Sequence, residues 1–182
     1  MPLMLVLVFS LFLSAFYGTH KDNDADIWQA RGAVIAQQML VEQSAARRAC
    51  QATVCAIGVI NSSAQLPEVF AGNPPFVTIS GESAPRMRSY FDGTWILTVY
   101  TEPGASTWTG PVNGQIETQL AQATPPAFMC NVGYWNGSTQ KVVLHGYRTL
   151  VAPSCPPQSF PGGFVGVTLP DGIPVMLTKL LG

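Results

Sequence analysis

The first seventeen residues of the sequence, MPLMLVLVFSLFLSAFY, limit where the rest of the chain can fold, because they contain no charged side chain. Three aspartates follow within five positions, at Asp22, Asp24 and Asp26. As a helix, residues 2–17 would span about 24 Å at about 1.5 Å per residue. That length is less than a hydrocarbon core of about 30 Å, yet it exceeds the usual apolar region of a signal peptide. The segment is therefore either a membrane anchor or a signal peptide that is removed.

The residues around the apolar segment favour an anchor that is retained. A cleavable signal peptide normally begins with basic residues and ends at an A-x-A-like site. Here the α-amino group of Met1 is the only positive charge ahead of the segment, and the nearest approach to a cleavage site is LSA at residues 13–15. We predict a membrane anchor at residues 1–18, with a signal peptide as the alternative, and a periplasmic domain at residues 19–182. Both interpretations export that domain.

Composition excludes one class of partner and predicts short elements. The chain has 182 residues, enough for one domain with its own core and an appendage. Only 10% of the residues are charged and the formal net charge is −1, so no basic field exists to attract nucleic acid. The 17 glycines and 15 prolines predict many turns and short strands.

A helical pattern follows the aspartates, in the residues ADIWQARGAVIAQQMLVEQSAARRAC. Its apolar residues form two neighbouring rows: Ile27, Val34, Val41 and Ala45, and Trp28, Ile35 and Met39. Spacings of seven and four residues place both rows on one helical stripe, and Gln43 falls largely off it. We predict a helix at residues 25–50, capped by Asp24 or Asp26, that buries this stripe in its own domain. The alternative is that part of the stripe packs on another subunit, as in a homo-oligomer.

Cys50, Cys55, Cys130 and Cys155 form an even set in a chain that we expect to be exported, which favours disulfide bonds. Four cysteines allow three pairings. Cys50 with Cys55 would close the short loop CQATVC where the helix should end, and Cys130 with Cys155 would join two strand regions across 24 intervening residues. We favour this local pairing. No C-x-x-C spacing occurs, so the cysteines indicate neither a zinc site nor a redox pair.

The rest of the chain is rich in strand and turn signals. The dipeptide DG at 92–93 predicts a hairpin with a type I′ turn, and NG at 136–137 predicts the tip of a second hairpin. Residues 113–124 predict a short helix that two prolines end, and IPVMLTKLL predicts a last strand near the C-terminus. The predicted fold is α+β, with an N-terminal transmembrane helix continuing into an amphipathic helix and then a mostly antiparallel sheet domain with one short helix.

The sequence gives no positive sign of an enzyme. It contains neither of the glycine-rich phosphate-binding motifs and no G-x-S-x-G motif. His145 lies on a predicted strand, and we expect a structural or surface role for it. The carboxylates after the helix are spread over several elements, so no two of them are placed as an acid–base pair. We therefore predict no catalytic, cofactor-binding or metal-binding residues.

Four segments, in order along nearly the whole chain, resemble one known family. They are AQQMLVEQSAA (36–46), GVINSSAQLPEVF (58–70), VGYWNGSTQKV (132–142) and LPDGIPVMLTKLL (169–181). Together with the apolar N-terminus they resemble the PilM family of conjugative and type IVb thin-pilus systems, which is unrelated to the actin-like ATPase of the same name. The segments are similar, in turn, to the Ala/Gln-rich helix, the Leu-Pro segment, the strand–turn–strand with Asn-Gly and the apolar last strand of that family.

The resemblance implies a bitopic inner-membrane protein with a periplasmic domain, which belongs to a pilus basal body or pilin transport apparatus and is not catalytic. We therefore expect a non-catalytic component of a type IV (conjugative thin) pilus assembly apparatus, held in the bacterial inner membrane by residues 2–17. Its expected partners are other pilus-assembly proteins or pilin, with no nucleic acid and no cofactor. One alternative is a minor pilin or pseudopilin-like subunit, although the basic leader, the glycine before the cleavage point and the early glutamate of a prepilin are missing. The other is an exported hydrolase with a cleaved signal.

Overall fold

The computed structural model describes residues 2–73, 75–78, 82, 84–101, 111–123, 131–144, 158–159 and 169–180. For residues 2–24, 111–113, 144 and 158–159 it describes the backbone alone. The elements are, in chain order, α1 (Pro2–Ala52), β1 (Gly58–Val59), the 3-10 helix η1 (Ser63–Gln65), β2 (Met87–Phe91), β3 (Trp95–Tyr100), α2 (Pro111–Ala123), β4 (Val132–Asn136), β5 (Lys141–Leu144), β6 (Gln158–Ser159) and β7 (Pro174–Lys179). The predicted α+β class is confirmed.

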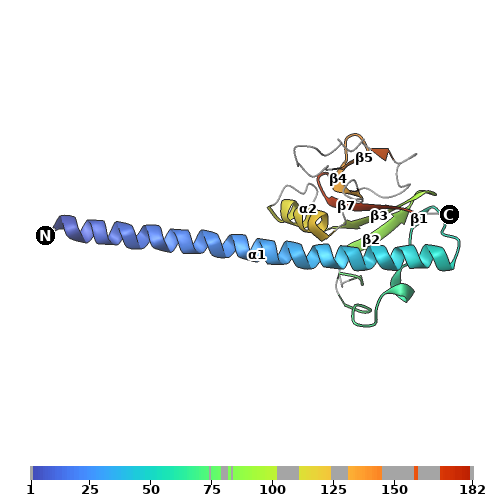
Figure 1. The fold of residues 1–182 in the computed structure, drawn as a ribbon, viewed down its shortest axis with the longest axis horizontal. Coiled ribbons are helices and arrows are strands. Elements are labelled where there is room, and N and C mark those ends of the chain that lie inside the picture. Colours follow the sequence, from blue (N-terminus) through green and yellow to red (C-terminus); the bar gives the residue numbers. More distant parts are fainter. Residues whose placement is uncertain are drawn as a thin grey trace.

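The helix α1 is continuous over 51 residues, and its N-terminal part extends away from the sheet in Figure 1. Residues 25–50 are helical as predicted, but the predicted start is wrong. The helix begins at Pro2, so Asp24 and Asp26 lie inside it and cannot be N-caps. Proline suits the first helical position, and the sequence contains no later proline before the end of α1. No proline therefore interrupts the helix between the apolar segment and the part of α1 that packs on the sheet.

The membrane anchor predicted at residues 1–18 stays a prediction, because their side chains lie outside the described residues. In the part of the chain that the structure describes, no helix combines the length and the apolar character needed to cross a membrane.

The strands form one sheet with the order β1-β2-β3-β7-β4-β5-β6, and every pairing between described strands is antiparallel. The strand β7 lies between β3 and β4, so the last strand of the chain occupies the middle of the sheet. The helix α1 packs on β2 and β3, while α2 packs on β4 and β7 and lies alongside α1. Figure 1 shows both helices on the same side of the sheet.

Both predicted hairpins are present, but their turns differ from the prediction. In the β2–β3 hairpin Gly93 has φ 101°, whereas Asp92 is not among the described residues with positive φ. A type I′ turn needs positive φ at both positions, so this prediction is wrong. Instead the Asp92 carboxylate accepts hydrogen bonds from the backbone N–H of Thr94 at 2.8 Å and of Trp95 at 2.6 Å. The β4–β5 connection is the four-residue turn 137–140 rather than a two-residue tip.

The core confirms one row of the predicted helical stripe and corrects the other. Ile35 and Met39 are buried against the sheet, and Trp28 is partly buried beside them. Ile27 and Val34, in contrast, are 60% and 56% exposed. Farther along the same row, Val41 packs partly buried against the core and Ala45 is fully buried. The second row therefore turns toward solvent in its first half and joins the core in its second half.

Candidate functional site

Four polar side chains form a buried network where α1 crosses the sheet. Glu42 and Gln43, both on α1, are 2% and 4% exposed, and Ser89 and Thr98 are fully buried. Ser89 on β2 lies directly opposite Thr98 on β3, and their hydroxyl oxygens are 2.9 Å apart. Thr98 also donates a hydrogen bond to Gln43 Oε1, and Gln43 Nε2 donates to the Ile96 carbonyl at 3.4 Å. The network fixes the position of α1 on the two strands, because each buried polar group needs its partner.

Glu42 is the charged member of this group, and a loop supplies its second partner. Its Oε1 accepts hydrogen bonds from the Ser89 hydroxyl at 3.0 Å and from the Ser62 hydroxyl at 2.7 Å. Ser62 lies just before η1 and is itself buried. The other carboxylate oxygen, Oε2, has no hydrogen-bond partner among the residues that the structure describes. Those residues thus offer no hydrogen-bond donor to Oε2 of this buried carboxylate.

Burial raises the pKa of Glu42, because the protein interior disfavours the charged carboxylate. The hydrogen bonds from Ser62 and Ser89 act in the opposite direction, since they stabilise the charged form and lower the pKa. Burial has the larger effect, so the pKa lies above its usual value of 4.5. Glu42 therefore holds its proton more readily in the folded protein than it would in an unfolded chain.

A cavity of about 320 Å³ opens beside Glu42, between α1, the segment after β1 and the strand β2. That volume is at the lower end of the range found for small-ligand sites. Its polar lining residues are Glu42, Asn61, Ser62, Ser63 and Arg88. The remaining walls are apolar: Val59, Ile60, Leu66, Phe76, Ala84, Pro85 and Met87. The cavity can hold an apolar group that ends in a polar or charged head.

The two charged residues of the lining point in opposite directions. Successive side chains of a strand alternate between the faces of a sheet, and Ser89 faces Glu42. The side chain of Arg88 therefore lies on the other face, where its Nε donates to the Pro85 carbonyl at 2.7 Å. It also contacts Tyr90, which lies on that same face. The lining on the α1 side thus carries one charged group, the Glu42 carboxyl.

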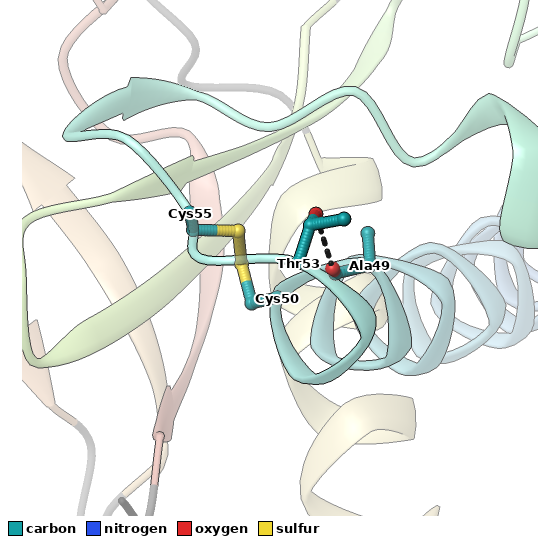
Figure 2. The surroundings of a disulfide bond; sticks show 4 residues. All are labelled: Ala49, Cys50, Thr53 and Cys55. Atoms are coloured by element: carbon teal, nitrogen blue, oxygen red, sulfur yellow. Dashed lines mark hydrogen bonds between the residues drawn. A yellow bond between two sulfur atoms is a disulfide. The ribbon is translucent and has the colours of Figure 1, made fainter.

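The structure joins two of the four predicted disulfide candidates. Cys50 and Cys55 form a disulfide at the end of α1, where the chain turns back toward β1 (Figure 2). Beside it the Thr53 hydroxyl donates to the Ala49 carbonyl at 3.2 Å, which helps to close the last helical turn. The predicted pairing of Cys50 with Cys55 is confirmed. Cys130 and Cys155 lie outside the described residues, and their pairing stays a prediction.

His145 lies outside the described residues. No three histidine, cysteine, aspartate or glutamate side chains come together as a metal-ligand set within the described ranges. The lining of the cavity contains hydroxyl groups and a carboxyl group but no histidine or lysine, so its residues do not include a serine–histidine pair.

Sequence reasoning missed Glu42 and placed Gln43 on the wrong side of the helix. Glu42 lies seven residues after Ile35 and three after Met39, so helical spacing puts it on the buried row. An acidic residue on an apolar row is a signal that the sequence does contain. The prediction that Gln43 falls largely off the buried stripe is wrong, because its position one turn from Met39 and Ala46 brings it against β3.

The fold defines a protein class, an α+β head carried at the end of one long N-terminal helix. Comparison with protein-family models, with curated proteins and with solved structures found no match to this chain.

Proposed function

We propose that this protein is a non-catalytic, membrane-anchored periplasmic component of a type IV (conjugative thin) pilus assembly apparatus or basal body. In this proposal residues 2–17 lie in the bacterial inner membrane and the head stands in the periplasm. The head docks other pilus-assembly proteins or pilin. The proposal combines the resemblance of four sequence segments to the PilM family with the arrangement of α1.

The observation that carries the proposal is the continuity of α1. The helix has 51 residues and would measure about 76 Å at about 1.5 Å per residue. Among the described side chains, Trp28 is the first of α1 that packs on the core, and Figure 1 shows the N-terminal part of the helix extending away from the head. A rigid connection of this kind suits a head held at a defined height above a membrane. A flexible linker would not fix that height.

Exposed apolar side chains on the head support a docking role. Val54, Ile57 and Val59, which follow the disulfide, are 100%, 73% and 61% exposed. We call these three residues the apolar edge, because Val59 belongs to β1, the outermost strand on that side of the sheet. Single exposed apolar residues are ordinary, but three within six positions, the last of them on an edge strand, favour contact with another protein.

A minor pilin or pseudopilin-like subunit is the second candidate. Proteins of that class also join a long N-terminal helix to an antiparallel sheet, and the passage of α1 from the apolar segment into the head favours it. The resemblance of the four sequence segments to the PilM family argues for the assembly component. The exported hydrolase receives no support from the cavity lining.

Cell fractionation followed by intact-mass measurement tests the proposal and separates the candidates. We expect the chain in the inner-membrane fraction, with the mass of the uncleaved sequence and without the mass of four free thiols. A chain recovered in sheared pili would favour the minor pilin. A soluble chain that begins at Phe16 or later would remove the anchor and with it the proposed role.

Complementation of a deletion strain tests the docking surface. Full-length protein should restore pilus assembly, and the double variant Ile57→Ser, Val59→Ser should not, although it should reach the membrane in equal amount. The matched control is Ile27→Ser, Val34→Ser, which changes two exposed apolar residues on α1 instead. Equal assembly with both double variants would contradict docking through the apolar edge.

A further inference from the structure

We propose that the cavity beside Glu42 receives the side chain of a lysine on a partner chain, with its ammonium group at the Glu42 carboxylate and its methylene stem along the apolar walls. This inference rests on the proposed docking role, because it names the chemistry by which a partner would be recognised.

The first argument is the incomplete surroundings of Glu42. Its side chain is almost fully buried and lines the cavity, and both described hydrogen bonds end on the same oxygen, Oε1. A carboxylate in a low-dielectric site is stable only when a positive charge or several donors face it. No such group reaches Oε2 from the described residues. A donor that enters through the cavity would complete the site.

The second argument concerns which cation fits. Metal ions such as calcium require six or more oxygen ligands, and the lining offers one carboxylate. A guanidinium group has five donors in a planar fork and would leave several of them without acceptors. An ammonium group is compact, and the acceptors that it needs are available as Oε2 and the oxygen atoms of Ser62 and Asn61. Leu66, Phe76 and Met87 can pack against its stem.

The third argument identifies a partner chain, rather than a free amine, as the source. Val59 lines the cavity, is 61% exposed and belongs to the apolar edge through which we propose that the head docks other proteins. The chain itself occupies the neighbouring edge of β2, because the Ser89 carbonyl accepts a hydrogen bond from the Ile60 N–H at 2.9 Å and the Met87 N–H donates to the Pro75 carbonyl at 3.1 Å. A partner docked on the apolar edge would therefore reach the cavity with a side chain rather than by adding a strand to β2.

The experiment uses the full-length protein in non-ionic detergent micelles, with its methionine methyl groups labelled for NMR. Met87 lines the cavity, so its methyl signal reports occupancy. The probes are Nα-acetyl-lysine methylamide, the uncharged Nα-acetyl-norleucine methylamide, n-pentylamine and the tripeptide acetyl-Val-Lys-Val-amide. We expect a saturable shift of the Met87 signal with the lysine probe, about tenfold weaker binding of the norleucine probe, and the tightest binding from the tripeptide.

Glu42→Gln keeps the shape of the side chain and removes its charge, and it should weaken lysine binding about tenfold. Its matched control is Glu68→Gln, an exposed site outside the cavity, which should bind as the wild type does. Ser63→Trp fills the exposed rim of the cavity and should abolish binding without altering the buried network. This last variant keeps the test valid if Glu42→Gln does not fold.

Three results would overturn the inference. Equal affinity for the lysine and norleucine probes would mean that the cavity only takes an apolar group. Unchanged binding by Glu42→Gln or Ser63→Trp would place the lysine elsewhere. Equal affinity for n-pentylamine and the tripeptide would mean that the cavity binds a free amine rather than the lysine of a partner chain. These readouts do not depend on membrane location or pilus assembly, so failure of the proposed function and failure of the lysine site are distinguishable.

Discussion

Gly32 of α1 lies so close to Gln115 of α2 that a Cβ atom built on the glycine would stand 2.7 Å from the Gln115 Cβ. The Gln115 carbonyl carbon and the Ile116 nitrogen would be at 3.1 and 3.2 Å. These neighbours include backbone atoms, which cannot move as the end of a flexible side chain can. The two helices therefore reach their packing distance only because residue 32 has no side chain.

We predict that Gly32→Ala lowers the free energy of unfolding by about 1–2 kcal/mol. Overpacking costs about 1–3 kcal/mol, and the better helix propensity of alanine returns up to about 1 kcal/mol. Chemical denaturation of the full-length protein measures the change. Gly114→Ala in α2 is the matched control, because a Cβ there meets nothing within 4 Å, and it should stabilise slightly. Equal effects of the two substitutions would contradict the close helix contact.

The hydroxyl of Ser89 connects the carboxylate of Glu42 to the hydroxyl of Thr98. Ser89→Ala should lower the free energy of unfolding by about 1–3 kcal/mol, because it leaves two buried polar groups without one of their partners. Ser63→Ala, at an exposed hydroxyl, should change it by less than about 0.5 kcal/mol. A small effect at both positions, measured by denaturation, would show that the network does not hold α1 in place.

The raised pKa of Glu42 predicts a pH-dependent difference between the wild type and Glu42→Gln. The folded state prefers the protonated carboxyl, so this contribution to stability is fully present below the unfolded pKa, near 4.5, and is lost as the pH rises through the higher folded pKa. The stability of Glu42→Gln relative to the wild type should therefore increase as the pH rises above the unfolded pKa and level off once the pH exceeds the folded pKa.

Thermal unfolding at a series of pH values checks the pH-dependent difference. The amide of glutamine can still accept the hydrogen bonds from Ser62 and Ser89, so the variant should keep its fold. A difference that stays constant with pH, or that shrinks as the pH rises, would mean that burial does not control the ionisation of Glu42.

The Cys50–Cys55 disulfide closes a loop with a sequence separation of 5. Chain entropy predicts that the double variant Cys50→Ala, Cys55→Ala lowers the free energy of unfolding by about 2 kcal/mol under non-reducing conditions. A reductant should remove most of the difference, because the wild type then loses the same link. A difference of equal size with and without reductant would assign the loss to packing around Cys50, which is 8% exposed.

Local signals in the sequence were sufficient to predict the secondary-structure elements named below and one disulfide. The spacing of Ile35 and Met39 identified the face of α1 that packs on the sheet, and the Asp-Gly and Asn-Gly pairs located both hairpins. CQATVC at the end of a helical pattern was enough to pair Cys50 with Cys55. Each of these features depends on residues within a few positions of one another, so a short stretch of sequence is enough to predict it.

Only the tertiary structure decided which polar residues become buried and what lies beside them. Glu42 meets Ser89 across 47 positions of chain, and β7 enters the middle of the sheet between β3 and β4. Such contacts depend on the order in which strands pair, which side-chain periodicity does not encode. The cavity lies between α1, β2 and the segment after β1, parts of the chain that only the folded structure brings together.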